Sequence, residues 1–407
     1  MSEPVERGLE DQSALTRLTG LPAPDFAREH WGERPLLIRS ADGFDDLFSA
    51  AAVDDLVADR ALRTPFVRMA EEGSVLSPSL FTSSGGFGAE IGDQLDSAKV
   101  LERFADGATL VLQGLHRTWD PIARFTRRLV EELGHPAQVN AYVTPASSRG
   151  FDPHYDTHDV FVIQIAGAKH WTIHEPVHRH PLADQPWTDH RADVSARARE
   201  KPVIDAVFEP GDVLYLPRGW IHSAVAQGET SIHLTIGVRA ATRHDLLTAL
   251  IRRAADDPAL RAPLPLGVGT ATADLSFDRA ATAAAVLRLL DAATSDDAIS
   301  SALQSTFERA TRPAPVRPLA TIDLLTALDP STIVGWRAGL RGRIDTDDES
   351  VRIVLPTKTI TLPGEAASAV RALRDQDSPA GALPDLDAAS SLVVARRLLR
   401  EGVLVAR

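Results

Sequence analysis

The 407-residue chain contains no cysteine, only four lysines, and few aromatic residues, which make up 5% of it. Without cysteine, the chain has no disulfide bonds, thiolate metal sites or thiol nucleophiles, so any metal must be held by imidazole and carboxylate groups. No apolar run reaches the roughly 18 residues that a membrane helix needs. The polar, acidic N-terminus also lacks the pattern of a signal peptide. We therefore expect a cytoplasmic protein that does not associate with membranes.

The chain is acidic, with 56 acidic against 43 basic residues and a formal net charge of −13. This balance argues against coating nucleic acid through its phosphates. It suits a basic protein partner, although an acidic surface often serves only solubility. The hydrophobic fraction of 44% is that of a globular protein, and the length predicts two or three domains.

The first predicted domain covers residues 1–240 and has a strand-rich core at about 136–240. Its first 135 residues mix amphipathic helical stretches with short strands. The core then contains short segments rich in Val, Ile and Thr, separated by Gly, Pro and Asp turns. That spacing predicts a β-sandwich or small barrel. Residues 178–202 show no clear period and are expected to form an inserted surface loop.

Two further domains are expected after residue 240. Residues 241–312 are alanine-rich, with apolar residues at helical spacing, which predicts packed helical hairpins. Three prolines within 311–318 mark a linker. Residues 320–407 give the order helix, paired strands, two helices and a terminal strand, which fits a winged helix. Because residues 321–407 carry 12 acidic and 11 basic groups, we do not expect this domain to bind DNA directly.

A candidate metal site begins at the start of a predicted strand, where His154 and Asp156 stand two residues apart. The period of two places both side chains on one face of the strand and turns Tyr155 away. His222, after a Gly-Asp turn and a strand, is the best candidate for a third ligand. Two imidazoles and one carboxylate form the facial set that binds iron and leaves three positions open. The same ligands also accept other metals, including Mn and Ni.

The alternative is that this spacing arose by chance, because the region is rich in histidine. The other histidines of the region are expected to be surface or packing residues: His158, His170, His174, His178, His180 and His190.

Lys169 is an independent indication of function. It follows the turn after the strand 159–166 and opens the next strand, so we expect the two strands to pair as a hairpin. An inward Lys169 would lie deeper in the barrel than the metal, where a lone ammonium group needs an anion. The distal carboxylate of 2-oxoglutarate would supply it. The alternative is a solvated residue of the hairpin.

Three segments together resemble the JmjC-type ribosomal oxygenases. They are NAYVTPASSRGFDPHYDTHDVFVIQIAGAKHWTIHEP (140–176), EPGDVLYLPRGWIHSA (209–224) and FAREHWGERPLLIRS (26–40). The resemblance implies a double-stranded β-helix (jelly roll) catalytic domain, then a helical dimerisation domain and a C-terminal winged helix, and hence a homodimer. The ending SIHLTIGVRA (231–240) is more similar to the bacterial members, which are arginine hydroxylases, than to the eukaryotic histidine hydroxylases.

Carried over by position, the resemblance makes His154, Asp156 and His222 the Fe(II) ligands, and Lys169 the residue that binds the C5 carboxylate of 2-oxoglutarate. Two further pairs each share a strand face. Asn140 and Tyr142 match positions that line the co-substrate pocket in relatives, or else form one satisfied polar pair in a packed strand. Thr235 and His233 either line the site or have structural roles.

The expected reaction consumes O2 and 2-oxoglutarate and gives succinate, CO2 and a hydroxylated side chain. The preferred substrate is an arginine or histidine on a basic ribosomal protein. One alternative is the same chemistry on a small molecule or a peptide natural product. Others are a cupin-like isomerase or sugar binder without 2-oxoglutarate, and a winged-helix regulator with a ligand-sensing barrel. Histone demethylation is disfavoured, since the sequence shows neither a reader module nor zinc-binding cysteines. The 178–199 loop is the poorest match to the family, so the substrate stays open.

Overall fold

The computed structural model describes residues 13–39, 43–71, 73–88, 90–146, 148, 151–270, 274–293 and 297–407. The expectation about a signal peptide rests largely on residues 1–12, which lie outside the described residues, and the turn-rich segment before His154 is described only in part. The chain divides into two compact units, Met1–Ala240 and Ala241–Arg407. None of the described helices is both long and apolar enough to cross a membrane.

The first unit contains the helical stretches that were expected before the strand-rich core. Helix α7 ends at Leu133, because Gly134 adopts a left-handed conformation (φ 67°) and donates its N–H to the Val130 carbonyl. Helix α4 begins at Ala50, because the Ser49 hydroxyl accepts a hydrogen bond from the N–H of Ala52. The helices are α2 (Ala14–Thr19), α3 (Ala23–Glu29), α4 (Ala50–Ala58), α5 (Ser97–Ala105), α6 (Leu115–Thr118) and α7 (Asp120–Leu133).

Most strands of this unit belong to one eight-stranded antiparallel sheet. Its order is β1-β11-β8-β13-β7-β6-β2-β3. The bounds are β1 (Leu36–Ile38), β2 (Val67–Glu71), β3 (Ser74–Val75), β6 (Thr109–Leu112), β7 (Ala137–Thr144), β8 (Asp159–Ala166), β11 (Val213–Leu216) and β13 (Ser231–Val238). A separate short pair joins β4 (Thr82–Ser83) to β5 (Gln94–Leu95).

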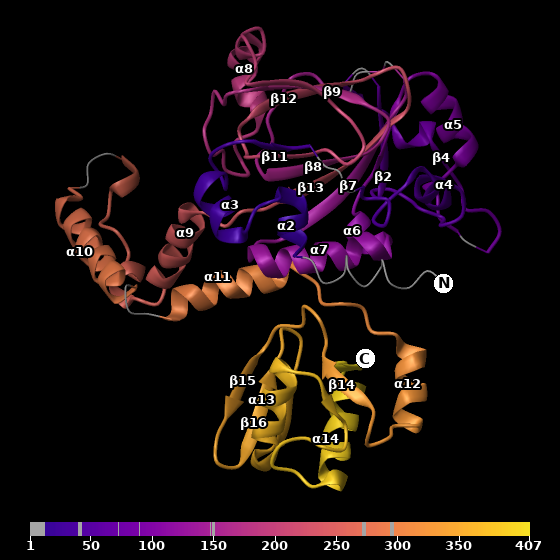
Figure 1. Ribbon diagram of the computed structural model, residues 1–407. Helices are drawn as coiled ribbons and strands as arrows, with labels where there is room; N and C mark the ends of the chain where they lie inside the picture. Colours follow the sequence, from indigo (N-terminus) through magenta and orange to yellow (C-terminus); the bar gives the residue numbers. More distant parts are fainter. Residues whose placement is uncertain are drawn as a thin grey trace. The chain divides into compact units, whose positions relative to one another are not determined.

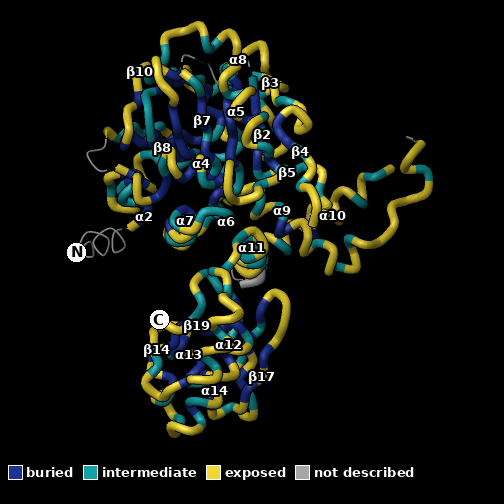
Figure 2. Tube along the Cα trace, turned by 90° about the vertical axis from the view of Figure 1, so that its right-hand side faces the viewer, coloured by how far each residue is buried: buried dark blue, intermediate teal, exposed yellow. Residues whose placement is uncertain are grey.

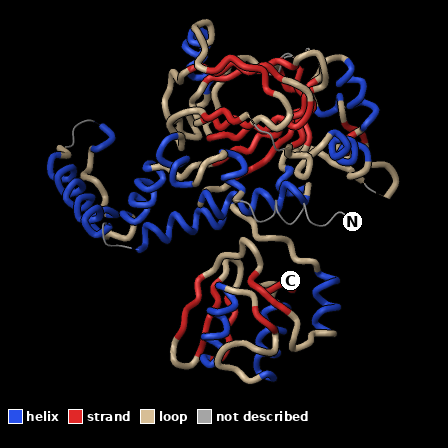
Figure 3. Tube along the Cα trace, viewed as in Figure 1, coloured by secondary structure: helices blue, strands red, loops and turns tan. Residues whose placement is uncertain are grey.

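A second sheet has three strands in the order β10-β9-β12, and Figure 3 shows the two layers of strands facing each other. Its strands are β9 (Lys169–His174), β10 (Ile204–Phe208) and β12 (Ile221–Ala226). The expected hairpin between β8 and β9 is therefore wrong, because β8 pairs with β11 and β13 while β9 pairs with β10 and β12. The chain crosses between the sheets at Gly167 (φ 61°), where a Cβ would lie 2.2 Å from the carbonyl oxygen of Thr230.

The predicted mainly-β core of two facing layers is confirmed. Strand β8 is buried on both faces, and its alternate residues enter two different clusters. Val160 and Val162 pack with Trp171 and Phe208 between the sheets. Phe161 belongs to the larger cluster that the N-terminal helices cover, and α2, α3 and α7 lie along that side of the large sheet (Figure 1). Figure 2 shows this buried interior in dark blue.

The insertion between β9 and β10 is more ordered than the sequence suggests. It contains the 3-10 turn η2 (Trp187–His190) and the helix α8 (Arg191–Arg197), so the expectation of an irregular loop is wrong for this part. The helical pattern is hard to read because α8 buries a single residue, Val194. Val194 packs against Tyr155 and Ile221, which anchors the insertion beside the first predicted metal ligand.

The second unit contains the predicted helices and paired strands. Helix α9 (Arg243–Ala254) starts with a capping box formed by Thr242 and Asp245, and α10 (Ser276–Ala293) and α11 (Asp297–Ala310) contact it. The last part has its own hydrophobic core. Its elements are α12 (Pro318–Thr326), β14 (Ile333–Trp336), β15 (Arg343–Thr346), β16 (Ser350–Val354), β17 (Thr359–Pro363), α13 (Ala367–Asp375), β18 (Ser378–Pro379), α14 (Ala388–Arg400) and β19 (Leu404–Ala406).

Candidate metal centre and its cavity

Two segments far apart in the sequence are joined where the candidate ligands lie. The His222 N–H donates to the His154 carbonyl (2.8 Å) and the His154 N–H donates to the His222 carbonyl (3.2 Å), which forms an isolated antiparallel bridge. The Asp156 carbonyl accepts from the N–H of Gly219 (3.0 Å), in the turn that leads into β12. Backbone hydrogen bonds therefore hold all three predicted ligands in one place. The expected strand start at His154 is wrong, because β8 begins only at Asp159, and His154 and Asp156 lie in the loop before it.

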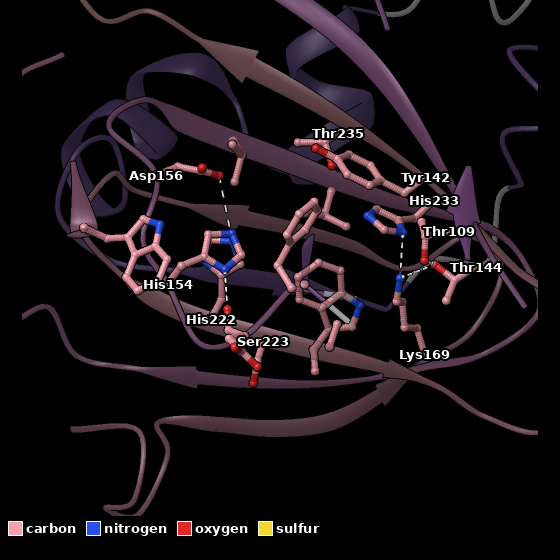
Figure 4. Close-up of a pocket in the computed structure, with 18 of the residues that line it drawn as sticks. Thr109, Tyr142, Thr144, His154, Asp156, Lys169, His222, Ser223, His233 and Thr235 are labelled. Carbon is pink, nitrogen blue, oxygen red and sulfur yellow. Dashed lines mark hydrogen bonds and ion pairs between the residues drawn. The ribbon is translucent and has the colours of Figure 1, made fainter. Parts of the chain in front are cut away.

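The side chains of these residues converge (Figure 4). One ligand atom from each of His154, Asp156 and His222 lies within 4.8 Å of the other two. His222 Nε2 is 3.8 Å from Asp156 Oδ2, and the two imidazole centroids are 4.4 Å apart. Within the described parts of the chain, this is the only cluster of three such groups. The donor set fits a divalent transition metal that keeps several positions open.

Backbone carbonyls orient both imidazoles. His154 Nδ1 donates to the Asp152 carbonyl (2.7 Å), and His222 Nδ1 donates to the Trp220 carbonyl (3.1 Å). Because a carbonyl oxygen only accepts, Nδ1 carries the proton in each ring and Nε2 presents its lone pair. Both rings are thus held in the tautomer that a metal requires.

The electrostatics favour the same protonation states. Burial lowers the pKa of His222 to about 4, with a further contribution from His154, so this ring is neutral near pH 7. For Asp156, burial raises the pKa, but His222, His158 and His154 outweigh it and the net shift is downward. The site therefore offers a neutral imidazole and a carboxylate, which bind a cation without first losing protons.

Lys169 lies in the same cavity, away from the metal ligands (Figure 4). Its side chain is 2% exposed, and Nζ donates to Thr144 Oγ1 (3.0 Å) and to His233 Nδ1 (3.5 Å). No carboxylate pairs with it among the described residues, and burial lowers its pKa to about 7. A buried ammonium group without a counter-ion marks a binding place for an anion.

The wall between the metal ligands and Lys169 comes from β7, β9 and β13. Tyr142 and His233 are cross-strand partners whose rings stack in parallel, with centroids 4.9 Å apart. Burial raises the pKa of Tyr142 and lowers that of His233 well below its ordinary value, so both are neutral. His233 accepts from Lys169 in this state, which holds the ammonium group in place.

The cavity measures about 520 Å³ and reaches from the metal ligands to Lys169. This volume is ample for a small dicarboxylate and a substrate side chain. The residues that line it include Arg68, Thr109, Tyr142, Thr144, Phe151, His154, Asp156, Lys169, Trp171, Trp187, Arg191, His222, Ser223, His233 and Thr235.

One predicted pocket residue is placed elsewhere. Asn140 shares a strand face with Tyr142 but is not among the lining residues, and its Oδ1 accepts from the N–H of Gly114 (3.0 Å). Thr235 and His233 do line the cavity. Of the histidines set aside from the sequence, His170 pairs outward with Asp205 (2.6 Å), and His178 contacts Gln185 (3.1 Å).

Several lining residues escaped prediction from the sequence. Strand alternation could have identified Thr144, which follows Tyr142 by two positions on β7. Trp171 follows Lys169 by the same interval on β9. Arg68 lies on β2, 86 residues before His154, and no sequence signal connects it to the site.

Comparisons with known proteins agree with this geometry. Residues 115–246 match the family model of the JmjC domain. Human "Ribosomal oxygenase 1" is 30% identical over 235 residues, which cover 57% of this chain and 35% of that protein. The "bifunctional lysine-specific demethylase and histidyl-hydroxylase NO66" of Drosophila simulans is 36% identical over 168 residues, 37% of this chain and 19% of that protein. The chain thus spans about a third of the length of the human relative, and less of the fly one.

Solved structures show a similar fold. That of E. coli ycfD covers 95% of this chain and 98% of its own, with a TM-score of 0.54 and 19% sequence identity. A second structure of E. coli YcfD, described as a ribosomal oxygenase in complex with cobalt and 2-oxoglutarate, has a TM-score of 0.51 and 18% identity over the same shares.

Proposed function

We propose that the chain is an Fe(II)- and 2-oxoglutarate-dependent oxygenase of the JmjC-type ribosomal oxygenase family, which hydroxylates an arginine or histidine side chain of a ribosomal protein. One observation carries the proposal. A cluster of two histidines and one aspartate shares a cavity with a buried lysine that has no carboxylate partner among the described residues. The buried lysine favours a metal-binding protein with an acidic co-substrate over one without.

The residues of the cavity would have distinct roles in binding the metal and the co-substrate. His154, Asp156 and His222 hold the iron, and their carbonyl-fixed tautomers keep the ligand geometry ready before binding. The Lys169 ammonium pairs with the distal carboxylate of 2-oxoglutarate, while Thr144 and His233 direct it into the cavity. When bound, iron and 2-oxoglutarate together supply the chemistry that activates O2 and oxidises a C–H bond, with succinate and CO2 as co-products.

A ribosomal protein as substrate is supported by the names of the relatives and by charge. Two of the relatives are ribosomal oxygenases or histidyl-hydroxylases. Ribosomal proteins are basic because they bind RNA phosphates, and a net charge of −13 favours their approach. A cytoplasmic location follows from that substrate and remains part of the proposal.

The domains after the catalytic core belong to the proposal too. We assign residues 241–312 to homodimerisation. Apolar side chains on α9 and α10 support this, because Leu247 is 47% exposed, Ile251 63% and Leu287 61%. Residues 320–407 would form a winged-helix-like domain that does not bind DNA directly, since its charges nearly balance.

The test is turnover without added substrate. Purified protein incubated aerobically with Fe(II) and 2-oxoglutarate should form succinate, and anaerobically it should bind 2-oxoglutarate. Absence of both would refute the oxygenase assignment, and binding without succinate would indicate a sensor. If turnover occurs, ribosomal proteins from a deletion strain should lack a +16 Da modification that the wild type carries. Unchanged ribosomal proteins would point instead to a small molecule or a peptide natural product.

A further inference from the structure

Arg68 is a charged residue of the cavity that the proposed chemistry does not use. It lies on β2, where it is the cross-strand partner of Val111, which in turn is the partner of Tyr142 on β7. Side chains in such a row share one face of the sheet, so Arg68 faces the cavity beside Tyr142. Its guanidinium interacts with the Tyr142 side chain, and its Cζ lies 5.9 Å from the centroid of the Phe151 ring.

The Nε atom of Arg68 is a donor without an acceptor. It is buried from solvent and has no hydrogen-bond partner within the described structure. Among the described residues, the Nε atoms of Arg17, Arg218 and Arg337 are buried without an acceptor too, but those residues do not line the cavity. At Arg68 a ligand bound in the cavity can supply the missing acceptor. Neither metal ligation nor the Lys169 anchor provides that acceptor.

Five of the described residues that line the cavity carry a charge. They are Arg68, Asp152, Asp156, Lys169 and Arg191. Asp156 belongs to the metal and Lys169 to the co-substrate, so neither compensates a charge on the substrate. Among the described lining residues, two arginines and one aspartate remain, which gives one net positive charge near the incoming side chain.

We propose that Arg68 is a specificity-determining residue, which admits a neutral side chain bearing a hydrogen-bond acceptor and rejects a guanidinium, so that the hydroxylated residue is a histidine and not an arginine. The inference rests on the proposed function. A neutral imidazole offers a lone pair to Nε of Arg68, whereas a guanidinium has only donors and is always charged. An arginine substrate would leave the Arg68 donor unpaired and place two like charges together.

The aromatic residues of the cavity do not alter this choice. The ring centroids of Phe151 and Trp187 lie 5.9 and 6.3 Å from that of His154. Such rings accept an imidazole by stacking and a guanidinium by cation–π attraction, so they discriminate little. Arg191 already lies over Trp187, with 4.7 Å between Cζ and the ring centroid. Charge and the Nε donor of Arg68 therefore decide between a histidine and an arginine substrate. They favour histidine, although residues 231–240 resemble those of bacterial arginine hydroxylases.

The first experiment identifies the modified residue. Ribosomal proteins from a strain lacking this protein are incubated with the purified enzyme, Fe(II), 2-oxoglutarate and O2, and mapped by mass spectrometry. We expect a 2-oxoglutarate-dependent +16 Da shift on a histidine. A shift on an arginine, or on any other residue, overturns the inference and leaves the oxygenase assignment standing. No shift and no succinate overturns both.

The second experiment tests Arg68 without turnover. A peptide spanning the modified histidine and its His→Arg counterpart are titrated anaerobically into protein loaded with Mn(II) and 2-oxoglutarate. The wild type should bind the histidine peptide at least about 10-fold more tightly. R68Q should lose about 10-fold for the histidine peptide, and R68E should prefer the arginine peptide.

Two control variants distinguish an effect of the charge of Arg68 from a general effect on folding. R68K keeps the positive charge but moves the donor, so it should still exclude the arginine peptide. R60Q removes an exposed arginine that pairs with Asp55 outside the cavity and should leave both affinities unchanged. Equal wild-type affinities for the two peptides would refute the role of Arg68, and that comparison needs no folded variant.

Discussion

The Nζ atom of Lys169 lies 3.5 Å from Nδ1 of His233, a cationic donor facing a neutral acceptor inside a cavity. The contact is stable only while His233 stays unprotonated, and burial together with Lys169 lowers the pKa of His233 well below its ordinary value. The pair holds the ammonium group in the cavity without neutralising it. Two measurable consequences follow for Lys169.

The first is proton uptake on binding 2-oxoglutarate. In the free protein burial lowers the pKa of Lys169 to about 7, so above pH 7 its amine is mostly neutral. A carboxylate beside it favours the charged form and raises the pKa again. We expect uptake to approach one proton per ligand at pH 8 and to fall towards zero below pH 6.

The measurement is anaerobic calorimetry with Mn(II)-loaded protein in two buffers of different ionisation enthalpy. K169A should weaken 2-oxoglutarate binding by about 100-fold, abolish the proton uptake and leave Mn(II) affinity unchanged. K201A, which removes an exposed lysine, is the matched control. Equal loss of metal and 2-oxoglutarate binding in K169A would mean that Lys169 is structural.

The second consequence is that the buried Lys169 lowers the free energy of unfolding near neutral pH. The folded-state pKa of Lys169 is about 7 against an unfolded value of 10.5, so between these values the unfolded chain binds the extra proton. Stability therefore rises with pH across this window. K169M keeps a flexible apolar stem without the charge, and we expect it to be more stable at pH 7 by up to about 4 kcal/mol.

Denaturant unfolding of K169M and wild type at pH 7 and pH 9 tests this. The gap between the two proteins should narrow as the pH rises. A variant that is less stable than the wild type at pH 7 would show that the hydrogen bonds of Lys169 to Thr144 and His233 outweigh its desolvation.

The sequence predicted the metal cluster better than the route of the chain around it. His154 and Asp156 were readable from their residue types and spacing, although the strand expected to begin there starts only at Asp159. His222 was readable because a Gly-Asp turn and a strand precede it. The crossing of the chain at Gly167 could not be predicted. A short turn has the same sequence pattern whether the strand after it pairs with the preceding strand or joins another sheet. Only the close approach of Gly167 to Thr230 distinguishes the two, and Thr230 is distant in sequence.

The prediction that Lys169 points into the barrel rested on an incomplete argument. The side chain points inward because β9 alternates within the small sheet, not because it returns beside β8. Asn140 shows the opposite case. Strand alternation correctly predicted the face that it shares with Tyr142, but its Oδ1 accepts a hydrogen bond from the N–H of Gly114, outside β7. Arg68 reaches the cavity through strand pairing alone, which a single sequence does not reveal.

The metal cluster makes a prediction that needs no turnover. H222A and D156A should each weaken Mn(II) binding by at least about 100-fold, because either change removes one of three ligands. Electron paramagnetic resonance of free Mn(II) measures this directly. H170A removes an imidazole that pairs with Asp205 outside the cavity and should bind Mn(II) as the wild type does. An effect of H170A equal to that of H222A would refute the assignment.

Trp171 lies in the wall of the cavity. It follows Lys169 by two positions on β9, is 5% exposed, and its ring centroid lies 6.2 Å from that of His222 and 5.4 Å from that of His233. Its Nε1 is buried without an acceptor among the described residues. We expect 2-oxoglutarate to accept this hydrogen bond, since an unpaired buried donor is costly.

W171F keeps an aromatic ring and removes the donor. Its affinity for 2-oxoglutarate should fall about 5- to 10-fold, the worth of one hydrogen bond of about 1 kcal/mol or slightly more, while Mn(II) affinity stays unchanged. W336F, which removes an indole donor bonded to Leu340 in the second unit, controls for a general loss of stability. If W171F binds 2-oxoglutarate as tightly as the wild type, Nε1 faces the apolar layer between the sheets, and Trp171 contributes packing alone.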